Sequence, residues 1–192
     1  MEKKVLVIDN YDSFTYNLVH SIEKILGQDI DIVRNDKIAL DEVDKYDYIF
    51  ISPGPGIPEE AGQTLEIVKT YYQTKKIFGV CLGLQSIVVA LGGKLENLKK
   101  VFHGIESNMH QTENKSLIFK NIKSTFRAGR YHSWVAEKTE IPTGILVTSV
   151  DDTGEVMAIQ HEKYPVFAVQ FHPESIMTPD GDLMIENFLN FS

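Results

Sequence analysis

The feature that most constrains this 192-residue chain is an alternation of short apolar runs with segments of helical periodicity, up to residue 92. The apolar runs, which we expect to be buried strands, cover residues 5–8, 30–33, 47–51 and 77–80. Apolar residues at helical spacing predict helices over residues 14–25, closed by Gly27, and around residues 65–72 and 85–91. Strands and helices that alternate with short joints predict a mostly parallel sheet with helices on both faces.

The pattern changes after Gly92 and Gly93. Short strand-like segments follow, such as SLIFKNI, GILVTSV, GEVMAIQH and FAVQFHPES, and a helix is expected over residues 181–191. We expect these strands to form a smaller, partly antiparallel sheet. The length suits a single domain over residues 1–192 of the α/β class.

Composition excludes several classes of partner. The net charge of −8 argues against binding to nucleic acid or to anionic membranes, because both favour a basic surface. No apolar stretch is long enough to span a membrane, and the start MEKKVLVIDN lacks the features of a signal peptide. The single cysteine rules out an internal disulfide and predicts a cytoplasmic protein.

That cysteine lies in the sequence GVCLG, where the strand ending at Val80 meets the next helix. A turn tight enough to expose its central side chain needs small neighbours, as in the nucleophile elbow G-x-S-x-G. The helix N-terminus would favour the thiolate of Cys81, and the N–H of Leu82 would face the oxyanion of a tetrahedral intermediate. The alternative is that Cys81 is simply a small buried apolar residue.

A candidate base follows near the end of the chain, in AVQFHPES. His172 and Glu174 are two residues apart, so both side chains point the same way if this segment is extended. A carboxylate beside an imidazole fixes its tautomer and stabilises the imidazolium. An inconsequential surface pair is the alternative. A metal site is not predicted, because no C-x-x-C, H-E-x-x-H or comparable ligand spacing occurs.

Three strings in the same chain and in this order, SPGPG, GVCLGLQ and QFHPES, resemble the class I (triad-type) glutamine amidotransferases. The resemblance covers nearly the whole chain and implies a flavodoxin-like α/β fold. DNYDSFTYNLVHSIE, RNDKI, GRYHSW and FHPESIMTPDG are similar to the glutaminase subunits of anthranilate synthase and of aminodeoxychorismate synthase.

The resemblance implies roles for individual residues. Cys81 matches the nucleophile, and His172 and Glu174 match the rest of the triad. The expected glutamine site and oxyanion hole comprise Gly54, Pro55, Gly56, Leu82, Gln85, Ser133 and Trp134. Leu84 departs from the His or Met of many relatives, which affects only local packing or partner contact.

The implied activity is hydrolysis of glutamine through a cysteine thioester, without a cofactor. The ammonia would pass to a separate, large chorismate-binding synthase subunit, with anthranilate synthase favoured over aminodeoxychorismate synthase. Residues 10–16 and 131–134 are candidates for the surface that faces this large partner.

Two other functions remain as alternatives. A hydrolase or redox protein could use a cysteine elbow on the same fold without glutamine, although Gln85 and the PGPG loop favour the amidotransferase. A non-catalytic scaffold would not need Cys81, His172 and Glu174 together.

Overall fold

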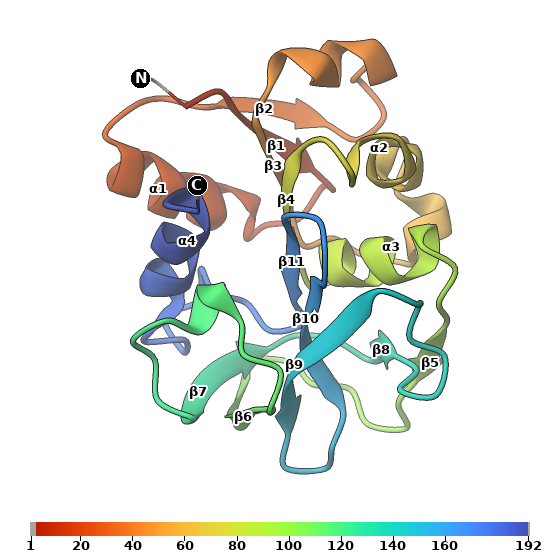
Figure 1. Cartoon of the computed structure of the whole chain (residues 1–192), viewed down its shortest axis with the longest axis vertical. Coiled ribbons are helices and arrows are strands. Elements are labelled where there is room, and N and C mark those ends of the chain that lie inside the picture. The colour runs from red at the N-terminus through yellow and green to blue at the C-terminus, as the bar shows by residue number, and fades with distance from the viewer. Residues whose placement is uncertain (1–2, 192) are drawn as a thin grey trace.

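The computed structural model describes residues 3–191 of the chain (Figure 1). The helices are α1 (Thr15–Leu26), α2 (Thr64–Tyr71), α3 (Leu82–Ala90) and α4 (Gly181–Leu189), with short 3-10 helices η1 (Leu40–Lys45), η2 (Pro58–Glu60) and η3 (Leu117–Phe119). The first strands are β1 (Val5–Asp9), β2 (Asp31–Arg34), β3 (Tyr48–Ile51), β4 (Lys76–Val80) and β5 (Leu95–Asn97). The others are β6 (Ile105–Gln111), β7 (Thr125–Arg130), β8 (Trp134–Ala136), β9 (Ile145–Asp151), β10 (Val156–His161) and β11 (Val166–Val169).

Nine strands form one sheet in the order β2-β1-β3-β4-β11-β10-β9-β6-β7. The first five are parallel, in the 2-1-3-4-5 order of flavodoxin-like sheets if β11 is counted as the fifth strand. The other four continue the same sheet in antiparallel pairing, and β5 pairs with β8 in a separate two-stranded antiparallel sheet. The predicted α/β class is therefore confirmed, with most of the antiparallel strands joined to the main sheet.

Helices cover both faces of the parallel strands, as Figure 1 shows. Because successive side chains of a strand point to opposite faces, Val5 and Val7 belong to the core under α1 and α4. Leu6 and Ile8 belong to the core under α2 and α3 on the other face. This double burial explains why these strands read as continuous apolar runs.

The element boundaries lie within a few residues of those predicted, but one predicted strand is wrong: SLIFKNI forms the 3-10 helix η3 and the turn after it. Helix α1 ends where expected, because Gly27 adopts φ 65° and its N–H bonds the Glu23 carbonyl. Helix α4 ends at Leu189, two residues before the predicted end. Among residues 3–191 there is no helix whose length and apolar content would let it cross a bilayer.

Parallel strands end at the same edge of a sheet, and this arrangement positions the candidate site. The loop of residues 52–56 follows β3, Cys81 follows β4, and His172 lies three residues after the end of β11. Because β11 pairs directly with β4, Cys81 from the middle of the chain and His172 from near its end lie at the same edge of the sheet.

Candidate active site

Cys81 occupies a strained turn between β4 and α3. Its backbone has φ 53° and ψ −102°, a conformation that costs a non-glycine residue roughly 1–3 kcal/mol. The surrounding structure holds this turn in place, since the Cys81 N–H donates a 2.8 Å hydrogen bond to the Val169 carbonyl at the end of β11. The thiol is thus presented at the N-terminus of α3, and the residue is only 6% exposed.

The glycines on either side of Cys81 are needed for close packing. A Cβ atom on Gly79 would lie 2.6 Å from the carbonyl carbon of Gly83. A Cβ atom on Gly83 would lie 2.5 Å from the carbonyl oxygen of Ile51 on β3. Only glycine lets the first turn of α3 pack this tightly on the strand ends, which is the requirement predicted from GVCLG.

His172 and Glu174 form a buried pair, with 2.7 Å between His172 Nδ1 and Glu174 Oε1. Their side chains are 2% and 0% exposed, which excludes the interpretation as a surface pair. The segment is a turn rather than the extended stretch we expected, because the Ser175 N–H bonds the His172 carbonyl. The side chains meet all the same, and the Thr178 hydroxyl also donates to the His172 carbonyl at 2.6 Å.

The environment of His172 favours its protonated form. Burial opposes a charge there, but the carboxylate of Glu174 and the interaction with Cys81 outweigh it and raise the pKa of His172 well above its ordinary value. Glu174 occupies Nδ1, and within the described residues Nε2 has no partner by hydrogen-bond geometry. The pairing of Nδ1 with Glu174 therefore leaves Nε2 available to Cys81.

Two small cavities adjoin Cys81. One, of about 160 Å³, is smaller than the roughly 300–1,000 Å³ of pockets for drug-sized ligands. Its lining residues are Gly54, Pro55, Gly56, Cys81, Gln85, Tyr131, His132, Ser133 and Trp134. These include every residue predicted to bind glutamine except Leu82. The other cavity, of about 190 Å³, is lined by His172, His103 and Tyr131 among others.

A larger cavity of about 400 Å³ lies elsewhere, lined by residues such as Lys4, Asp29 and Tyr46. These residues precede β1, β2 and β3, so this cavity is at the amino edge of the parallel strands. Ligands of such sheets bind at the carboxyl edge, which favours the cavities beside Cys81.

The predicted oxyanion donors lie at the start of α3 and in the loop after β3. Leu82 is the first residue of α3, so its N–H has no acceptor within the helix. Gly54 lies against it: a Cβ atom on Gly54 would be 2.7 Å from Leu82 Cδ2 and 2.6 Å from Asn10 Cβ. Gly56 adopts φ 74°, and Pro55 between the two glycines has no N–H to donate.

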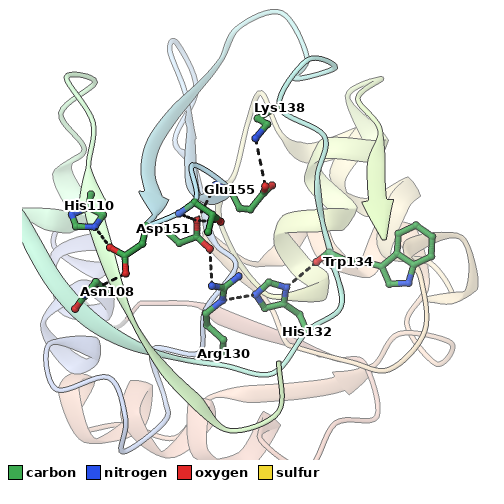
Figure 2. Close-up of polar contacts among 10 residues, drawn as sticks. Asn108, His110, Arg130, His132, Trp134, Lys138, Asp151 and Glu155 are labelled. Carbon is green, nitrogen blue, oxygen red and sulfur yellow. Dashed lines mark hydrogen bonds and ion pairs between the residues drawn. The ribbon is translucent and has the colours of Figure 1, made fainter. Parts of the chain in front are cut away.

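A buried polar cluster supports the segment that lines the smaller cavity (Figure 2). Arg130 pairs with Asp151 at 2.7 Å, and both side chains are buried. Arg130 Nε also donates to His132 Nε2 at 3.1 Å, and His132 Nδ1 lies 3.0 Å from the Trp134 carbonyl oxygen. Burial, reinforced by the charge of Arg130, lowers the pKa of His132 to about 3, so this imidazole is neutral at pH 7.

Asp151 is held as a carboxylate in the same cluster. Burial opposes its charge, but hydrogen bonds from Thr153 and from the Glu155 N–H, together with Arg130, keep its pKa below the ordinary value. The cluster therefore ties the turn between β9 and β10 to the segment that contains Ser133 and Trp134.

One residue of the site was not anticipated from sequence. Gln170 Nε2 lies 3.5 Å from Cys81 Sγ, and Gln170 Oε1 accepts a hydrogen bond from Gln85 Nε2 at 3.2 Å. The available signal was its place in QFHPES, two residues before His172. His103, which had no assigned role, contacts Tyr131 edge-on, with 6.1 Å between ring centroids.

Comparison with known proteins agrees with this geometry. The model of the family "Glutamine amidotransferase class-I" matches residues 6–191. Aminodeoxychorismate/anthranilate synthase component 2 of Bacillus subtilis is 43% identical, over 96% of this chain and 95% of that protein. The bifunctional protein TrpGD of Thermotoga maritima is 44% identical. The match covers 98% of this chain, and this chain spans only 32% of the length of that protein.

Among solved structures, a protein of Thermoplasma acidophilum described as a GMP synthase subunit superposes with a TM-score of 0.86. It is 26% identical, and the match covers 98% of this chain and 93% of that one.

Proposed function

Because this chain belongs to the class-I glutamine amidotransferase family, we propose that it hydrolyses glutamine at Cys81 and supplies the ammonia to a separate chorismate-using synthase subunit. The observation that carries this proposal is that Cys81, in its strained turn, and His172, buried with Glu174, line the same cavity. The cavity on one side of the thiol is small enough to favour an amino acid as substrate.

The reaction starts from the ion pair of the Cys81 thiolate and the His172 imidazolium. The sulfur adds to the side-chain carbonyl carbon of glutamine, and N–H groups of Leu82 and of the loop at residues 54–56 bind the oxyanion. The imidazolium gives its proton to the amide nitrogen, the C–N bond breaks, and ammonia leaves a glutamyl thioester.

Water completes the cycle. Neutral His172 takes a proton from the water that attacks the thioester carbonyl carbon. The C–S bond then breaks, glutamate leaves, and the thiolate–imidazolium pair is restored. Glu174 holds the imidazole and stabilises its charge in both halves of the reaction. No cofactor is needed for these steps.

Anthranilate synthase is our first assignment for the partner, and aminodeoxychorismate synthase is the second. The name of the Bacillus subtilis relative carries both activities, so the relatives support either chorismate-using partner. A free thiol is kept reduced in the cytosol, which supports a cytoplasmic location.

The partner would bind at the carboxyl edge of the sheet. Tyr11 and Tyr16 are 47% and 65% exposed, and Ile176, which follows the triad segment, is 98% exposed. Asn10 belongs to a buried network with Ser52 and Asn35 instead, so the proposed surface begins at Tyr11 rather than Asn10. Large exposed apolar side chains around a reactive centre are typical of an interface.

The test is reconstitution of the chain with the chorismate-using subunit of the same organism. The wild-type complex should form its aromatic product with either glutamine or an ammonium salt, and the identity of the product assigns the pathway. Cys81→Ala should abolish the glutamine-dependent reaction and keep the ammonium-dependent one. Equal loss of both reactions would make Cys81 structural. Peptidase activity without use of glutamine would favour the hydrolase alternative.

A further inference from the structure

We infer that Gln170 donates its side-chain amide N–H to the sulfur of Cys81, in an orientation imposed by Gln85 and the carbonyl group of Trp134. The contact links Gln170 Nε2 and Cys81 Sγ at 3.5 Å, and both residues are buried. The inference deepens the proposed function, because it assigns a second group, beside His172, that acts on the nucleophile.

The orientation of Gln85 follows from the carbonyl that it faces. A backbone carbonyl can only accept, so the amide nitrogen of Gln85 must point to Trp134 O, at 3.0 Å. The second hydrogen of the same nitrogen is then directed to Gln170, 3.2 Å away. Gln170 must present its oxygen to this donor.

The cluster of Figure 2 strengthens this constraint on the Trp134 carbonyl. Arg130 can only donate, so His132 Nε2 must accept, and the proton of the neutral ring must be on Nδ1. His132 therefore donates to Trp134 O. The carbonyl oxygen receives two donors, from His132 and Gln85, which occupy its two lone pairs.

With its oxygen committed to Gln85, Gln170 can present only its NH₂ group to the sulfur. A flipped amide would place Gln170 Oε1 against the thiolate and two NH₂ groups against each other, losing both hydrogen bonds. Because Gln170 is fully buried, water could not replace them. The hydrogen-bond chain from Arg130 to Gln170 thus ends with a donor at Cys81.

A donor directed at sulfur stabilises the thiolate over the thiol. Gln170 should raise the fraction of reactive thiolate before attack. Given the proposed function, it should also stabilise the same thiolate as it leaves the glutamyl thioester. Nothing in this role requires contact with the substrate, so the effect should persist in the free protein.

The first test measures the alkylation rate of Cys81 by iodoacetamide against pH, without glutamine or a partner. Gln170→Leu and Gln170→Met should shift the midpoint of this profile upward by about one pH unit, since a hydrogen bond to a charged group is of that order. Gln160→Leu is the matched control, because Gln160 lies on β10 and its amide donates to the Lys115 carbonyl. An unchanged midpoint in either folded Gln170 variant would overturn the inference.

Other titratable groups stay the same in these variants. His172 with Glu174 faces Cys81, and Asp12, His103, Tyr131 and His132 line the two adjoining cavities. Circular dichroism establishes which variants are folded. If neither Gln170 variant is folded, the test instead follows the NMR signals of the Gln170 side-chain amide in the wild-type protein as the pH is raised. They should move when Cys81 ionises, and signals that do not move would contradict the inference.

The second test is a double-mutant cycle with Gln85→Met, which removes the donor that orients Gln170. Alone it should raise the alkylation midpoint, and in the Gln170→Leu background it should have no further effect. Additive shifts would show that Gln85 does not act through Gln170. Alkylation does not require glutaminase activity, so failure of the proposed function would leave these results interpretable.

Discussion

The backbone N–H of Cys81 donates a 2.8 Å hydrogen bond to the carbonyl oxygen of Val169. Val169 ends β11, and its register partner on β4 is Val80, the residue before the cysteine. One parallel strand pair therefore carries the nucleophile at one carboxyl end and leads into Gln170 and His172 at the other. This pairing supplies the alignment that the proposed chemistry requires.

The close approach of Gly83 to Ile51 predicts the cost of adding one methyl group. Gly83→Ala should lower the free energy of unfolding by about 1–3 kcal/mol, because its Cβ would lie 2.5 Å from a backbone oxygen that cannot rotate away. Denaturant unfolding measures this loss. Glutaminase activity should fall as well, since the first turn of α3 carries the Leu82 N–H.

Gly27→Ala is a comparator for the Gly83 variant. A side chain at Gly27 is also unfavourable, but through φ 65° alone, because no atom of residues 3–191 lies within 4 Å of the added Cβ. This variant should lose stability without loss of activity. Equal loss of activity in both variants would contradict a local effect on the cysteine turn.

Glu174→Gln should change the pH dependence of glutamine hydrolysis. In the wild type, the raised pKa of His172 keeps its imidazolium, and the stability that it contributes, until the pH rises through that raised value. Without the carboxylate, burial lowers the pKa of His172, so the high-pH limb should move to lower pH. The maximal rate should fall by roughly 10²–10⁴.

The pH–rate profile of the variant with its partner measures this change, and Glu186→Gln, on the exposed face of α4, is the control. A rate loss without movement of the high-pH limb would mean that Glu174 does not set the protonation of His172.

Asp151→Asn should destabilise the protein and weaken glutamine binding. It leaves the buried guanidinium of Arg130 without its carboxylate, a change that costs about 3–5 kcal/mol. KM for glutamine should rise, because Arg130 and His132 position the Trp134 segment. Chemical denaturation and steady-state kinetics measure the two effects.

The acid side of the stability profile gives a further check on Asp151. Its lowered pKa contributes stability above its unfolded value of about 3.9, and this stability is lost as the pH falls through the folded value. Asp151→Asn should lack this acid-dependent contribution to the free energy of unfolding. Asp152→Asn is the matched control, because its exposed carboxylate pairs with His110 and Asn108 at the surface, and its effect should stay within about 0.5 kcal/mol.

The parallel half of the sheet was predictable because buried strands leave an unambiguous pattern. Residues 5–8 and 77–80 are apolar throughout since helices cover both their faces. The position of β11 beside β4 was not predictable, because nothing local in FAVQFHPES distinguishes parallel from antiparallel pairing. For the same reason, the continuity of β9, β6 and β7 with the main sheet emerged only from the structure.

The candidate site also contains some residues that the sequence predicted and others that it did not. Cys81, His172 and Glu174 were predicted because their chemistry is distinctive and small or rigid residues flank them. Gln170 and Arg130 lay within motifs that were noted, QFHPES and GRYHSW, yet their residue types are usually exposed. Their importance comes from burial and from partners on other strands, which a single sequence does not reveal.

The most direct measurement is covalent labelling of the wild-type protein by an electrophilic glutamine analogue, with the modified residue identified by mass spectrometry. We expect one adduct, on Cys81, with glutamine slowing its formation. An adduct elsewhere, or labelling of Cys81 that glutamine does not slow, would contradict the assignment of Cys81 as the nucleophile of glutamine hydrolysis.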